Sequence, residues 1–174
     1  TGNFSIEKDE VKQFMDLTKR VTPTKGQVFK DSKMVIDEQY RDVDVYYIES
    51  EEEALYEVLQ KVAQTANSYF NYEINGIEKA QVMKYTAPSN GYSWHIDIGA
   101  DGIAANRKIA VSILLNEDYE GGEMAFRTAE QIEKVKPKTG EVVAFSSFIS
   151  HSVRPVTKGK RYVVVAWFTG PHFR

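Results

Sequence analysis

The chain has 174 residues, of which 42% are hydrophobic and 27% charged, so it is long enough for one domain with a buried core and has the composition of an ordinary globular protein. Its net charge of −3 argues against a dedicated nucleic-acid-binding protein. It contains no cysteine, which excludes disulfides and thiolate metal sites, so any bound metal must be held by His, Asp or Glu.

The sequence shows no sign of a membrane segment. No apolar run reaches the length of a bilayer span, and no signal peptide is recognisable near the first residue. We therefore expect no membrane partner and a cytoplasmic location. The chain begins with Thr rather than Met, so a trimmed targeting segment stays an open alternative.

The first predicted element is a helix over residues 4–20, because Val11, Phe14, Met15 and Thr18 follow helical spacing. A break at residues 21–26 follows, and then a mixed stretch with β-rich pieces such as 43–48.

A second helix is predicted over residues 51–70, where apolar residues from Ala54 to Phe70 form one broad stripe. Ser50 and Glu53 resemble a capping box at its start. The acidic residues that accumulate before and within its first turn indicate a solvated surface that ends at a helix N-terminus. We expect the apolar stripe to cover one face of a sheet.

From about residue 77 the pattern changes to short β-like runs separated by turn signals rich in Gly, Pro, Asn and Asp. The predicted strands are 78–86, 93–98, 107–115, 122–126, 131–136, 141–146, 150–156 and 160–168. Eight short strands without an intervening helix predict a sandwich or a jelly-roll barrel.

Within this β region, His95 and Asp97 are two residues apart on a predicted strand, so they face the same side, while Ile96 faces a second layer. His151 begins a later strand that can pair nearby. Two imidazoles and one carboxylate suit one face of an Fe(II) octahedron and leave the other face for a co-substrate and O2. An H-x-D pair alone is a weak motif, but its position in the β region strengthens it.

Arg161 lies in a predicted strand with a long apolar run, where a guanidinium needs an anionic partner. One alternative is a structural carboxylate. The other is a dicarboxylate co-substrate such as 2-oxoglutarate, which an arginine binds in a bidentate manner.

These residues resemble a known family, the Fe(II)/2-oxoglutarate dioxygenases of the prolyl-4-hydroxylase superfamily, and PKHD-type hydroxylases in particular. The resemblance covers about residues 78–174 and rests on the stretches around His95 and Asp97, on Arg107-Lys108, on 119–123, on 140–162 and on 166–171. It implies a mainly β protein with α-helices, in which a double-stranded β-helix (a cupin-like jelly roll) carries the N-terminal helices on one sheet. The whole chain, 1–174, would be one dioxygenase domain, with 1–76 as helical support and 77–174 as the catalytic core.

The resemblance also implies roles for single residues. His95, Asp97 and His151 would be the iron ligands, and Arg161 would bind the distal carboxylate of 2-oxoglutarate. The remaining roles concern the pocket. Tyr85 would add a hydroxyl to that carboxylate, Met124 and Val153 would line the co-substrate pocket, and Tyr92 and Trp167 would lie near the substrate; plain core packing is the alternative for Tyr85, Tyr92 and Trp167.

Two positions depart from the family pattern. Leu114 stands where some relatives have a further co-substrate tyrosine, and Ser152 stands where PKHD-type sequences usually have Arg. Both differences bear on the substrate rather than on the metal site.

The activity implied is hydroxylation of a C–H bond with release of succinate and CO2, with ascorbate as a candidate reductant. A peptidyl proline is the favoured substrate, as in prolyl 4-hydroxylases of the procollagen-proline type, so we expect a proline-containing peptide or protein as partner. The alternatives are a free amino acid, a small metabolite, a nucleic acid bound by the basic segment 134–174, or a non-catalytic jelly-roll module that binds a metal. We also predict that loop 99–106 closes over the substrate.

Overall fold

The computed structural model describes residues 4–173 as two α-helices, a short 3₁₀ helix and sixteen strands. The helices are α1 (Lys8–Arg20), α2 (Glu53–Phe70) and η1 (Ile103–Asn106). The strands that precede residue 80 are β1 (Phe4–Ser5), β2 (Thr24–Lys25), β3 (Val28–Lys30), β4 (Lys33–Val35), β5 (Arg41–Asp42), β6 (Asp44–Tyr47) and β7 (Gly76–Ile77). The later strands are β8 (Gln81–Thr86), β9 (Gly91–His95), β10 (Arg107–Leu114), β11 (Tyr119–Gly121), β12 (Met124–Thr128), β13 (Gln131–Val135), β14 (Glu141–Ser146), β15 (Ser150–Val153) and β16 (Val156–Thr169).

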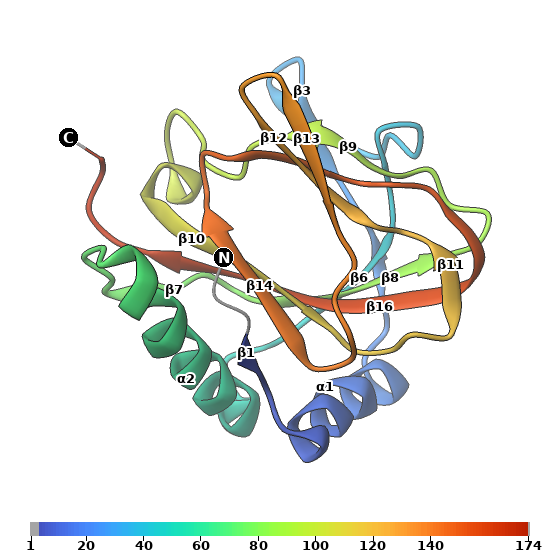
Figure 1. The fold of residues 1–174 in the computed structure, drawn as a ribbon, viewed down its shortest axis with the longest axis horizontal. Coiled ribbons are helices and arrows are strands. Elements are labelled where there is room, and N and C mark those ends of the chain that lie inside the picture. The colour runs from blue at the N-terminus through green and yellow to red at the C-terminus, as the bar shows by residue number, and fades with distance from the viewer. Residues whose placement is uncertain (1–3, 174) are drawn as a thin grey trace.

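The strands form two antiparallel sheets that face each other as a jelly roll (Figure 1). The larger sheet has the order β1-β14-β10-β16-β8-β6-β2, and β7 and β11 pair with other parts of the long strand β16. The smaller sheet has the order β13-β12-β15-β9-β5, and β3 and β4 form a separate hairpin. The predicted jelly roll is therefore confirmed.

Both helices cover the outer face of the larger sheet, on the side opposite to β9, β12 and β13 (Figure 1). The stripe of α2, including Leu55, Leu59 and Val62, is buried in one cluster with Phe14 and Leu17 of α1 and with sheet residues such as Val111 and Val164. The expectation that this stripe covers a sheet face is confirmed.

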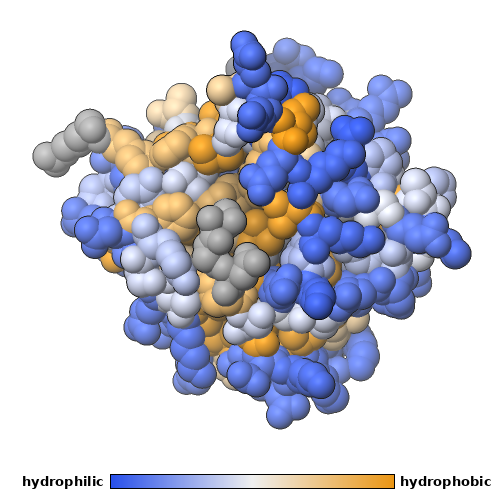
Figure 2. Space-filling model, in the orientation of Figure 1, coloured by the Kyte–Doolittle hydropathy of each residue, from blue (hydrophilic) through white to orange (hydrophobic). Residues whose placement is uncertain are grey.

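A second apolar cluster fills the space between the two sheets. Because β10 is covered by helices on one face and by the smaller sheet on the other, seven of its eight residues are buried, and from Ile109 onward its residues are apolar except for Ser112. Figure 2 shows apolar side chains near the centre of one face of the molecule and hydrophilic residues around its periphery. Several of the predicted site residues, including Tyr85 and Trp167, belong to this second cluster and so lie between the two sheets.

Three local expectations are wrong. Phe4 and Ser5 form strand β1 rather than the first turn of a helix, because they pair with Val142 and Glu141 at the edge of the larger sheet. The helix α1 begins only at Lys8, where the carboxylate of Glu10 accepts the N–H of Glu7 at 2.8 Å.

The other two concern Ser50 and Ile96. No capping box joins Ser50 to Glu53, because α2 begins at Glu53 and the Ser50 hydroxyl donates to Glu51 instead. Ile96 does not pack in a second layer, since half of its surface (51%) is exposed to solvent.

Among the described residues, no helix is both long and apolar enough to cross a membrane.

Candidate metal centre

His95 and His151 lie directly opposite each other on neighbouring strands, His95 at the end of β9 and His151 in β15. Asp97 follows just beyond the end of β9, where its backbone N–H donates to the carbonyl of Ser147 at 2.9 Å. The alternation that placed His95 and Asp97 on one side is therefore correct in its result, although a loop contact rather than strand pairing holds Asp97.

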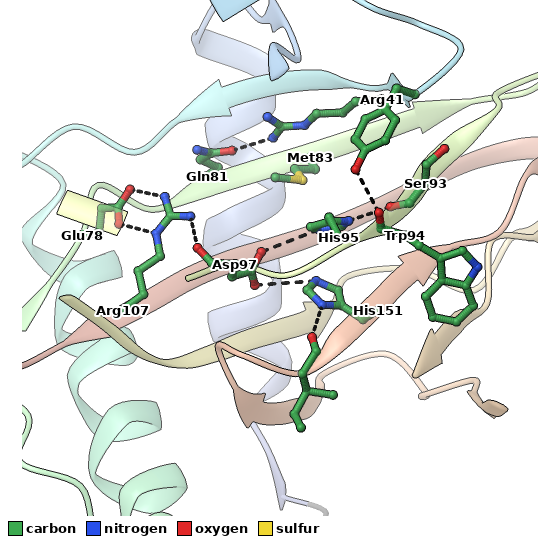
Figure 3. A network of polar contacts seen from close by, with 12 residues as sticks. Arg41, Glu78, Gln81, Met83, Ser93, Trp94, His95, Asp97, Arg107 and His151 are labelled. Carbon is green, nitrogen blue, oxygen red and sulfur yellow. Dashed lines mark hydrogen bonds and ion pairs between the residues drawn. The ribbon is translucent and has the colours of Figure 1, made fainter. Parts of the chain in front are cut away.

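The three side chains converge on one point (Figure 3). Nε2 of His95 lies 3.6 Å from one carboxylate oxygen of Asp97, and Nε2 of His151 lies 3.6 Å from the other. Metal–nitrogen and metal–oxygen bonds are about 2.1 Å long, so two ligands of one ion lie up to about 4.2 Å apart. Both separations fit a single metal ion between the three groups.

The outer nitrogen of each histidine is already engaged by the backbone. Nδ1 of His95 lies 2.6 Å from the carbonyl of Ser93, and Nδ1 of His151 lies 2.9 Å from the carbonyl of Ile149. A neutral imidazole that donates from Nδ1 leaves the Nε2 lone pair free for a metal. These contacts fix both the tautomer and the direction of the two rings.

Burial, and after it the neighbouring His151, lowers the pKa of His95 to about 4. His95 is therefore neutral at pH 7, as a metal ligand must be. Its ring stacks on that of Tyr92, with 3.7 Å between the centroids, while the ring of Phe145 lies 4.6 Å from His151. The donor set and its packing thus fit Fe(II), which favours imidazole together with a carboxylate.

Arg161 lies deep in the same cavity and pairs across the sheet with Tyr85 of β8. Only 1% of its surface is exposed, and its Nε and Nη1 atoms have no hydrogen-bond partner among the residues that the structure describes. Within residues 4–173 no carboxylate forms an ion pair with it, so the structural-carboxylate alternative has no support there. A buried guanidinium without an anion is costly, which indicates that a negatively charged ligand completes it.

The other predicted site residues also line this cavity. Tyr85, Tyr92, Met124, Val153 and Trp167 all line it, together with further apolar residues of the larger sheet, namely Met83, Val111, Phe145, Val163 and Val165.

Their contacts differ. Met124 and Val153 are direct cross-strand neighbours, whereas the Tyr85 hydroxyl has only the sulfur of Met83 at 3.8 Å as an acceptor. The indole N–H of Trp167 is buried and finds no hydrogen-bond partner within residues 4–173.

The two positions that depart from the family pattern are both buried. Leu114 is part of the apolar cluster between the sheets. The hydroxyl of Ser152 is buried without a partner, and Ser152 does not line the cavity.

Sequence reasoning assigned no site role to two residues beside the centre, Glu78 and Arg107, although Arg107 is part of the family resemblance. Arg107 donates from Nη1 to the carbonyl of Asp97 at 3.0 Å and makes a bidentate ion pair with Glu78 (Figure 3). Its position at the start of an apolar strand was a usable signal, since the same argument drew attention to Arg161. The partner, 29 residues away, was not readable from the sequence.

A jelly roll with a buried His-Asp-His centre defines a class of metal-dependent oxygenases. Residues 80–169 match the model of the 2OG-Fe(II) oxygenase superfamily, so the chain belongs to this family.

The chain is similar to a PKHD-type hydroxylase of Alteromonas mediterranea, with 33% identity over 86 residues. That match covers 45% of this chain and 38% of the relative, so it spans well under half of the relative's length.

Two solved structures share the fold. A prolyl-4-hydroxylase of Pseudomonas putida has a TM-score of 0.74 at 17% identity and covers 98% of this chain and 92% of its own. A prolyl hydroxylase of Trichoplax adhaerens, in complex with a peptide fragment of the hypoxia inducible factor oxygen degradation domain, has a TM-score of 0.73 at 21% identity, with 97% and 83% covered.

Proposed function

We propose that this protein, a single domain over residues 1–174, is an Fe(II)- and 2-oxoglutarate-dependent dioxygenase that hydroxylates peptidyl proline, in the manner of a prolyl 4-hydroxylase. The observation that carries the proposal is that one cavity holds both a set of candidate metal ligands and a guanidinium without an anionic partner. The three metal-ligating side chains converge at one place, and the guanidinium of Arg161 lies in the same cavity. A ligand with a chelating end and a distal carboxylate can bind the metal with one end and pair with Arg161 through the other.

In this proposal His95, Asp97 and His151 hold the iron, and Arg161 orients 2-oxoglutarate through its distal carboxylate. Tyr85 donates its hydroxyl to that same carboxylate, and Met124 and Val153 form an apolar wall beside the co-substrate. When bound, the iron supplies activation of O2, coupled to the decarboxylation of 2-oxoglutarate to succinate and CO2. The apolar lining of the cavity excludes water from the reacting atoms.

The substrate side is assigned to the part of the cavity near Tyr92 and Trp167, with loop 99–106 closing over it. Residues 103–106 of that loop form the 3₁₀ helix η1, and Ile103 is 68% exposed. A prolyl hydroxylase with the same fold binds a peptide, which supports a peptide as the substrate class here. The roles of O2 and of ascorbate as reductant belong to the proposal as well.

The first test is an anaerobic titration of the metal-free protein with Fe(II) and 2-oxoglutarate. We expect the weak visible charge-transfer band of an Fe(II)–keto-acid chelate, and its loss in Arg161→Ala at the same co-substrate concentration. Arg154→Ala is the matched control, because Arg154 is exposed and lies close to the same strand β16. Bound iron without a band in the wild type would contradict the proposal and favour a non-catalytic metal-binding module.

The second test addresses the substrate. Succinate formation is measured with proline-containing peptides, with the same peptides carrying Ala in place of Pro, with free proline, and with single-stranded DNA or RNA. We expect stimulation only by the proline-containing peptides, together with a mass increase of one oxygen on the peptide. Stimulation by free proline, or by single-stranded DNA or RNA in a salt-dependent manner, would replace the peptide substrate by one of those classes.

A further inference from the structure

Glu78 and Arg107 form a partly buried ion pair at the edge of the metal centre, and neither residue has a role in the proposed reaction. The side chains are only 17% and 18% exposed, and two N–H groups of Arg107 donate to the two carboxylate oxygens of Glu78 at 2.5 and 2.6 Å. A bidentate pair of this kind holds the guanidinium plane in one orientation. The pair therefore holds the Arg107 guanidinium in a fixed position beside the site.

The remaining Nη1 group of Arg107 contacts the metal-ligand segment. It donates to the backbone carbonyl of Asp97 at 3.0 Å, as Figure 3 shows, while the N–H of Asp97 donates to Ser147. Asp97 lies beyond the end of β9 and so lacks the pairing that orients His95 and His151. Both backbone hydrogen-bonding groups of Asp97 are thereby engaged, and one of the two contacts comes from Arg107.

The guanidinium carbon of Arg107 also lies 4.0 Å from the ring centroid of Trp167, which is a cation–π distance. The Trp167 ring lines the cavity, and its indole N–H is buried without a partner. The backbone N–H of Glu78 donates to the carbonyl of Trp167 at 2.9 Å, so all three residues are joined.

We propose that Arg107, held by Glu78, is a positioning residue that orients both the Asp97 ligand and the Trp167 indole of the active-site cavity. The inference rests on the proposed metal site, because it assigns Arg107 a function only if Asp97 binds a metal. The unpaired indole N–H is then presented to the ligand that occupies the cavity. Arg107 acts through these two residues and contacts neither metal nor substrate itself.

The test compares Arg107→Gln, Arg107→Lys and Glu78→Gln with Arg20→Gln. Arg20 makes a bidentate pair with Glu52 between the two helices, far from the cavity, so it controls for the loss of an Arg–Glu pair. Binding of Mn(II) alone, followed by electron paramagnetic resonance, gives a readout that does not need turnover. Outer contacts of metal ligands alter affinity by about 10–100-fold, so we expect a loss of roughly tenfold or more in Arg107→Gln and none in Arg20→Gln.

A second readout follows Trp167 directly. The chain has two tryptophans, so Trp94→Phe leaves Trp167 as the one indole fluorophore. In that background we expect acrylamide to quench Trp167 more strongly after Arg107→Gln, because the guanidinium no longer covers the ring. Arg107→Lys keeps the charge but not the planar fork, so it should not restore wild-type Mn(II) affinity.

A folded Arg107→Gln protein with wild-type Mn(II) affinity and unchanged quenching would overturn the inference, as would full restoration by lysine. Should Arg107→Gln not fold, Glu78→Gln decides in the same way: weakened Mn(II) binding supports the inference, and wild-type binding overturns it. If the wild type binds Mn(II) but never forms the 2-oxoglutarate chelate, the proposed function fails while the positioning of Asp97 is still decided by these affinities.

Discussion

Two arginines, one buried and one partly buried, show that the residue type alone does not determine the partner of its guanidinium. Arg107 has Glu78 and a backbone carbonyl as acceptors, whereas Arg161 has Nε and Nη1 atoms without partners. An apolar strand predicts only that its arginine needs an anion. The sequence could not show that one arginine pairs with a structural carboxylate and that the other faces the metal-ligand cavity, because that carboxylate, on Glu78, lies 29 residues away in the segment between β7 and β8.

The Tyr85 hydroxyl provides a test of the co-substrate site at this scale. Burial raises the pKa of Tyr85, so the phenol stays protonated and can donate to a carboxylate beside Arg161. A hydrogen bond to a charged group contributes about 1.5–3 kcal/mol. We expect Tyr85→Phe to raise the KM for 2-oxoglutarate by roughly tenfold or more and to leave kcat nearly unchanged.

The control is Tyr162→Phe. Tyr162 lies next to Arg161 in β16 but packs against the other apolar cluster, away from the cavity. It should keep the wild-type KM. An equal KM in both variants would show that the Tyr85 hydroxyl does not bind the co-substrate and would favour plain core packing.

At the level of elements, the sequence pattern predicted a strand or helix correctly where the signal was local. The His95–Asp97–His151 set was predictable because strand alternation and the family resemblance agree on it. Phe4 and Ser5 were assigned to a helix because their pairing with β14 spans more than 130 residues of sequence and leaves no local signal. The contacts of the Ser93 and Ile149 carbonyls with the two histidine rings could not be predicted either, since every residue has a backbone carbonyl.

Gly91 tests how strictly the β9–β15 pairing defines the metal centre. Its φ is +75°, and a Cβ there would lie 2.2 Å from the carbonyl oxygen of Val153 in β15. Gly91→Ala must therefore push the two strands apart, which separates His95 from His151. We expect a loss of stability of more than about 2 kcal/mol and markedly weaker Mn(II) binding, measured by denaturant unfolding and by metal titration.

Gly102→Ala is the control for the backbone strain alone. Gly102 has a φ of +63°, but nothing lies within 4 Å of its added Cβ. Its backbone strain should cost about 1–3 kcal/mol and leave Mn(II) affinity unchanged. Equal effects of the two substitutions would show that the close contact with β15 is unimportant.

In the whole molecule, the two faces of the larger sheet have different roles: the outer face packs against the helices, and the inner face carries site residues. The larger sheet buries α1 and α2 against its outer face, and its inner face contributes Arg161, Tyr85 and Trp167 to the cavity. Neither helix supplies a residue that lines the cavity. The helices therefore support the sheet that carries the site without taking part in ligand binding.

Leu59→Ala tests this division. Leu59 of α2 is fully buried in the cluster between helices and sheet, so its truncation should lower the free energy of unfolding by about 2–5 kcal/mol. Gln60→Ala, on the exposed side of the same helix, should change it by less than about 0.5 kcal/mol. Denaturant unfolding gives both values, and Mn(II) titration below the unfolding transition gives the metal affinity of the same proteins. Because the sheet lies between Leu59 and the cavity, we expect the wild-type metal affinity in both variants. If the metal affinity of Leu59→Ala falls together with its stability, the two faces of the sheet are energetically coupled.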